Sequence, residues 1–144
     1  MTSPLAAPRP GTWVLDLRGT SPRTLAAVRT WAATCLADLG GVHRADVLLI
    51  ASELVANAYL HGGGPRHIQL WRGVRPCAVR IEVGDFSADH PLVTRTLSGH
   101  SDALGIRLVD RVAVRWGVHH GPHHDGKTLW AHISCDGGCG PEDC

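Results

Sequence analysis

Residues 45–63, "ADVLLIASELVANAYLHGG", form a long apolar run with a regular polar pattern inside it. Glu53, Asn57 and His61 recur at intervals of four, which advances only about 40° per step around an α-helix, so they share one stripe. Apolar side chains surround this stripe: Val47, Ile50, Ala51, Leu54, Val55 and Ala58. The run therefore predicts a helix that buries one face and carries a carboxylate, an amide and an imidazole in a line beside it.

The segments around this helix alternate in their predicted structure. Residues 12–19 alternate apolar and polar side chains, as a half-buried strand does, and residues 20–41 open with Ser21-Pro22 and close with Gly40-Gly41, as a helix does. Further on, the pattern predicts hairpin strands at 66–73 and 77–86, an irregular loop, a helix at 104–117 and a last strand at 127–134. This order favours an α+β fold, a two-layer α/β sandwich with a mixed sheet.

The composition bounds the class of protein. A chain of 144 residues, 44% of them hydrophobic, fits one globular domain. Its net charge of +1 gives no basic signature, so we expect no nucleic acid partner. The longest apolar stretches contain Glu, Asp, Arg or Asn, and residues 1–14 lack the charged-then-apolar order of a signal peptide. We therefore expect a cytoplasmic protein with no membrane segment, a disordered leader over 1–11 and one domain over 12–134.

The five cysteines are Cys35, Cys77, Cys135, Cys139 and Cys144. Their odd number, with two inside predicted regular elements, argues against a secreted disulfide framework. The last three lie in the Gly-rich stretch 135–144, which we interpret as a flexible tail. Three thiols there could also bind a soft metal, although their spacing matches no zinc pattern.

Asp85 lies at the end of the predicted strand 77–86. Strict alternation places it on the same face as Cys77, Val79, Ile81 and Val83, toward the layer where the helices should pack. A buried carboxylate is costly without a partner. The alternative is a capped turn in which Asp85 binds the backbone of the residues that follow it.

Four segments in this order resemble the GHKL ATPase superfamily: "ELVANAYLHGG", "VGDFSADHP", "ALGIRLVDRVAVRWG" and "DGKTLWAHI". Within that superfamily the chain is most similar to the stand-alone anti-sigma-factor serine kinases. The resemblance covers about residues 13–133. It implies a Bergerat-type ATP-binding fold with Mg²⁺ and ATP as cofactors.

The resemblance implies roles for the polar stripe. Asn57 would offer a neutral amide oxygen to Mg²⁺, a hard cation that prefers oxygen ligands. Glu53, one turn away, would orient or deprotonate an attacking hydroxyl as the catalytic base. His61 would approach the phosphates. The alternative for His61 is a histidine favoured at the C-terminal end of a helix by the helix dipole.

The resemblance also implies an adenine site. Asp85 would accept a hydrogen bond from the adenine amino group, with Ser87 after it and Thr128 on the last strand close by. Gly105, just before a helix, would let backbone amides approach the phosphates. The alternatives are an ordinary loop-to-helix turn at Gly105 and an ordinary strand residue at Thr128.

Three functions remain open from the sequence. The first is a protein serine/threonine kinase that phosphorylates an antagonist protein and restrains a sigma factor. A second copy of the chain, in a homodimer, is a further possible partner. The second is an ATP-responsive partner-switching module with weak phosphotransfer. The superfamily's Asp-x-Gly-x-Gly motif becomes "DFSAD" (85–89), so both of its glycines are absent. In addition, Ala88 does not continue the proline pattern of the serine kinases, and Ala103 replaces a glycine before the last helix. The third is a His/Cys metal-binding protein, because four imidazoles in "HHGPHH" (119–124) could chelate Zn²⁺ or Ni²⁺. The alternative for that cluster is a solvent-exposed turn.

Overall fold

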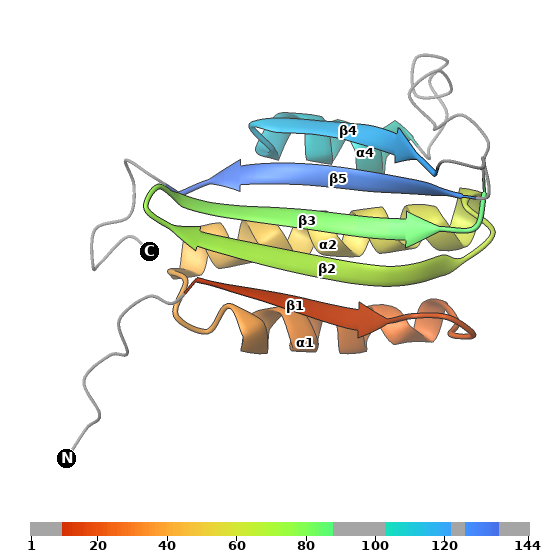
Figure 1. Cartoon of the computed structure of the whole chain (residues 1–144), viewed down its shortest axis with the longest axis horizontal. Helices are drawn as coiled ribbons and strands as arrows, with labels where there is room; N and C mark the ends of the chain where they lie inside the picture. The colour runs from red at the N-terminus through yellow and green to blue at the C-terminus, as the bar shows by residue number, and fades with distance from the viewer. Residues whose placement is uncertain (1–9, 88–102, 122–125, 136–144) are drawn as a thin grey trace.

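A computed structural model of the chain describes residues 10–87, 103–121 and 126–135. In it, α-helices cover one face of a five-stranded antiparallel sheet, and Figure 1 looks onto the other face, with the helices behind. The strands are β1 (Gly11–Asp16), β2 (Pro65–Val74), β3 (Cys77–Asp85), β4 (Arg115–His120) and β5 (Lys127–Ser134). The helices are the short 3₁₀-helix η1 (Pro22–Thr24) and the α-helices α1 (Leu25–Cys35), α2 (Gly41–His61) and α4 (Ala103–Val112).

The strand order is β1-β2-β3-β5-β4, and every neighbouring pair is antiparallel. The two-layer α+β architecture is as predicted, but the expected mixed sheet is wrong. A mixed sheet would arise if a helix carried the chain straight back into a last strand parallel to β3. Instead β4 adds one more reversal, so β5 runs against both β3 and β4 and lies between them (Figure 1).

The predicted helix 104–117 is also wrong at its C-terminal end. Helix α4 ends at Val112, and β4 begins at Arg115. Beyond Val112 the chain alternates: Trp116 and Val118 pack against the core, whereas Arg115 and His119 are exposed. A period of two fits a strand that can pair with β5, so these residues form a strand and do not extend the helix.

The core lies between the sheet and α2, as the apolar face of residues 45–63 predicted. Val47, Ile50, Leu54 and Val55 are fully buried on α2. They meet the inward row of the sheet, formed by Ile68, Leu70, Val79, Ile81, Val83, Leu129 and Ala131. Helix α2 is thus the central helix of its layer, and α1 and α4 flank it (Figure 1).

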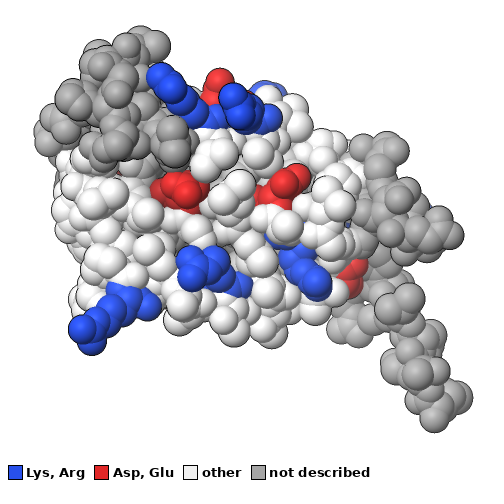
Figure 2. Space-filling model, turned by 180° about the vertical axis from the view of Figure 1, so that it is seen from behind, with Lys and Arg blue, Asp and Glu red and all other residues white. Residues whose placement is uncertain are grey.

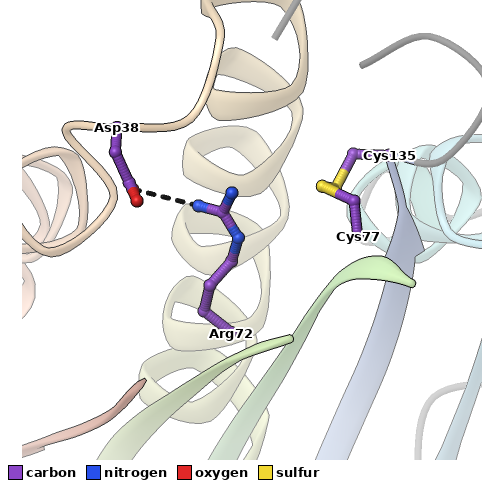
Figure 3. Close-up of a disulfide and its surroundings, with 4 residues drawn as sticks. All are labelled: Asp38, Arg72, Cys77 and Cys135. Atoms are coloured by element: carbon purple, nitrogen blue, oxygen red, sulfur yellow. Dashed lines mark hydrogen bonds and ion pairs between the residues drawn. A yellow bond between two sulfur atoms is a disulfide. The ribbon is translucent and has the colours of Figure 1, made fainter. Parts of the chain in front are cut away.

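A disulfide joins two neighbouring inner strands at the end of the sheet where β3 begins and β5 ends. Cys77 and Cys135 are bonded and both are buried (Figure 3). Close by, the buried guanidinium of Arg72 donates to Asp38 at 3.0 Å. Cys135 therefore belongs to the folded domain, although the sequence suggested that the tail begins there. An odd number of cysteines does not exclude one intrachain disulfide. Pairing depends on which two cysteines lie close together in the fold, and their number does not show this.

The helix layer carries charges of both signs, interspersed without a large patch of one sign (Figure 2). Among the described residues no helix is long and apolar enough to cross a membrane.

Candidate functional site

The predicted polar stripe lies along the C-terminal half of α2. Asn57 is buried, with 8% of its surface exposed, whereas Glu53 is only partly buried. His61 is the last residue of the helix and is partly buried. The 21-residue helix is continuous through all three, so the one-face geometry expected from their spacing holds.

The C-terminal end of α2 meets the end of β3, which brings the stripe and Asp85 to one end of the sheet. The backbone N–H of Phe86, just after β3, donates to the carbonyl of Gly62 at 3.0 Å. A Cβ atom at Gly62 would overlap the carboxylate of Asp85. Glycine at the C-terminal cap therefore allows the close approach of helix and strand. These segments, far apart in the sequence, form the candidate site.

Asp85 is buried as predicted, but protein groups already contact both of its oxygens. Its exposed fraction is 1%, one oxygen accepts the Ser87 backbone N–H at 2.9 Å, and the other lies 2.9 Å from the ammonium of Lys127. Burial raises the pKa of Asp85 above its ordinary value, while Lys127 and the Ser87 N–H oppose the increase. Lys127 is thus the partner that a buried carboxylate needs, so the burial of Asp85 is no longer an argument for a bound ligand.

Lys127 is the residue that the sequence analysis missed. It is the only lysine of the chain, and its side chain is 5% exposed. The signal was present, because Lys127 alternates with Leu129, Ala131 and Ile133 and must face the core as they do. A lysine at the start of one inward row and Asp85 at the end of another can form a pair where the two strands are neighbours, and the strand order of the sheet decides that.

Thr128 is not brought to Asp85. Asp85 pairs in register with Lys127, and Thr128 pairs with Gly84, so Thr128 lies on the opposite face of the sheet. Ser87 does lie at the site, where its carbonyl accepts from Lys127 at 3.5 Å. Gly105 lies within the first turn of α4, which begins at Ala103, and not before the helix as expected.

Part of the predicted machinery lies outside the described residues. This holds for Ala88, for His123 and His124, and for Cys139 and Cys144. Within 10–87, 103–121 and 126–135 no group of three or more histidine, cysteine or acidic side chains could hold a metal ion. The disulfide to Cys77 also occupies Cys135.

A search with models of known protein families and a search of curated proteins each found no match for this chain. The fold described above and the chemistry of its residues are therefore the basis for a functional proposal.

Proposed function

We propose that this chain is a cytoplasmic, ATP-binding regulatory protein of the GHKL type, with a Bergerat-type fold. In this proposal it is an anti-sigma-factor-type serine/threonine kinase, and it phosphorylates an antagonist protein that competes with a sigma factor. Disulfides are rare in the cytosol. In that compartment Cys77 and Cys135 would therefore persist as two neighbouring thiols.

The observation that carries the proposal is the meeting of α2 and β3 at one end of the sheet. An amide on α2, Asn57, and a buried carboxylate on β3, Asp85, come from segments 28 residues apart, and the contact of Gly62 with Asp85 joins their elements. The resemblance to the GHKL superfamily implies that Asn57 binds magnesium and that Asp85 binds adenine. A chance match of the motifs in the sequence would not require these two residues to lie at the same end of the sheet.

The donor set fits magnesium and ATP. Asn57 offers an uncharged oxygen of the hard type that Mg²⁺ accepts, and a metal held by one protein ligand completes its shell with water and phosphate oxygens. A carboxylate has about four lone-pair sites, and the Lys127 ammonium and the backbone N–H groups of Ser87 and Lys127 use three of those of Asp85. Asp85 can therefore accept one more hydrogen bond, from an exocyclic amino group.

Glu53 would supply the base. It lies one helical turn before Asn57, about 5–6 Å along the stripe, and it is partly exposed, so a partner's hydroxyl can reach it. A carboxylate in that place takes the proton of the attacking serine while Asn57 keeps the metal site.

The Lys127–Asp85 ion pair favours a second candidate, an ATP-responsive binding module with weak phosphotransfer. Lys127 competes with any ligand for Asp85, and it lowers the gain from one more hydrogen bond. In this second candidate ATP changes which partner is bound, and little phosphate is transferred.

The experiment is calorimetric titration of the full chain with ATP and Mg²⁺, using Asp85→Asn as the test variant and Asp46→Asn, at the other end of α2, as the matched control. Asparagine can turn an N–H toward the adenine donor and loses the charge, so affinity should fall about 10–100-fold, which corresponds to roughly 1.5–3 kcal/mol. Asp46→Asn should bind like the wild type. Equal ATP affinity in a folded Asp85→Asn protein, or absence of binding to the wild type, contradicts the proposal.

A further inference from the structure

The face of the sheet that no described helix covers carries a hollow that is separate from the proposed ATP site. Six side chains from four strands line a hollow of about 470 Å³ there: Gln69, Trp71, Arg80, Glu82, Arg115 and His132. This volume is within the range of small-molecule sites. Asp85 and Lys127 face the other layer, so this hollow shares no residue with them.

The strand register explains why these residues gather. Trp71 lies opposite Arg80, Arg80 opposite His132, and His132 opposite Arg115. These four residues form one row across β2, β3, β5 and β4. Because neighbouring strands are about 4.8 Å apart, the arginines flank His132 from both sides and can converge above it.

Arg80 is held in place from two directions. Its Nε donates to Glu82 at 2.8 Å, and its guanidinium lies 4.5 Å from the centre of the Trp130 ring. Trp130 in turn lies over Gly117, where a Cβ atom would come within 2.9 Å of the indole. A guanidinium fixed in this way has lost its flexibility before any ligand arrives, which favours binding.

The hollow has an excess of positive charge. Glu82 is the only carboxylate among its lining residues, and it already pairs with Arg80. The Arg115 side chain is exposed, and no carboxylate among the described residues pairs with it. Burial is the main cause of the lowered pKa of His132, and the positive charges of Arg115 and Arg80 lower it further. An anion placed between the two guanidinium groups would balance these charges.

Trp71 adds an aromatic surface beside the cations. Its ring lies over Gly73, where a Cβ atom would come within 2.8 Å of the indole, and 45% of the residue is exposed. The sheet thus supports the ring, and solvent reaches it. A planar group stacked on Trp71 would lie one strand away from Arg80.

We propose that this hollow binds a small aromatic carboxylate. The carboxylate lies between Arg80 and Arg115 above His132, and the ring stacks on Trp71. Aromatic stacking and charge-assisted hydrogen bonds then act on one rigid ligand, whereas a neutral ring or a simple anion satisfies only half of the site.

The test uses 2-naphthoate as the probe and its neutral amide, 2-naphthamide, as the matched ligand, in calorimetric titrations of the full chain. We expect saturable binding of 2-naphthoate, at least 10-fold weaker binding of 2-naphthamide and of acetate, and about 10-fold losses in Arg115→Gln and Trp71→Ala. Arg29→Gln, an exposed arginine on α1, should bind 2-naphthoate like the wild type.

Three results would overturn the proposal: no saturable binding at millimolar 2-naphthoate, equal affinity for acid and amide, or equal losses in Arg115→Gln and Arg29→Gln. Sedimentation of the same proteins gives a fourth. A wild-type dimer that dissociates in Arg115→Gln would show that a second copy of the chain covers this face. None of these outcomes depends on ATP binding, so failure here leaves the proposed function standing.

Discussion

Replacement of Lys127 by methionine should destabilise the protein severely at neutral pH. The variant keeps the length of the side chain and removes the ammonium that lies 2.9 Å from Asp85, in a place where the two side chains are 5% and 1% exposed. Among the described residues, only the backbone N–H groups of residues 87 and 127 would then remain as partners of a buried carboxylate, with no positive charge beside it. Breaking a buried pair by removing one partner costs about 3–5 kcal/mol.

Urea denaturation at pH 7 measures this loss. With an m value of about 2 kcal/mol per molar urea, the midpoint should fall by roughly 1.5–2.5 M. The double variant Lys127→Met/Asp85→Asn removes both charges and should recover most of the loss, because a neutral amide is far cheaper to bury than an unpaired carboxylate. Thr128→Val, on the opposite face of β5, is the matched control, and its midpoint should change little.

The pH dependence of the loss has a definite sign. Burial raises the pKa of Asp85 in the folded protein, so the folded state binds its proton more tightly than the unfolded chain does. The penalty in Lys127→Met is therefore full above the folded pKa and shrinks as the pH falls toward the ordinary aspartate value of 3.8. A loss below about 1 kcal/mol at pH 7, or a double variant less stable than Lys127→Met, would refute the reasoning.

Three further predictions concern other residues. Asn57→Ala should remove the enhancement of ATP binding by Mg²⁺ in a titration while the protein stays folded, and a full magnesium effect in the variant would exclude the ligand role. Glu53→Gln should lower phosphotransfer to a partner serine about 10²–10⁴-fold with little change in ATP affinity, and equal transfer rates would exclude the base. The folded state should lose stability as the pH falls below about 6.5. Burial lowers the pKa of both His67 and His132, so the unfolded chain takes up these protons first. Thermal melts at pH 7.5 and 5.5 should show the decrease, and it should be smaller in His67→Gln/His132→Gln; an unchanged difference in that variant contradicts the assignment.

Local patterns were sufficient for most of the elements. The alternation of Val79, Ile81 and Val83 predicted the face of β3 that is buried, and it also placed Asp85 in the core. The spacing of Glu53 and Asn57 predicted a continuous α2. These features follow from the chain alone, since periods of 2 and 3.6 residues are properties of one strand or one helix and need no partner.

Only the tertiary structure decided which groups face one another. The pair of Asp85 with Lys127, the bond of Cys77 with Cys135 and the place of Thr128 on the uncovered face all depend on β5 lying beside β3. Strand order and register are set by the packing of the whole sheet on its helices and by the extra reversal at β4, and such long-range pairing leaves no mark in local periodicity.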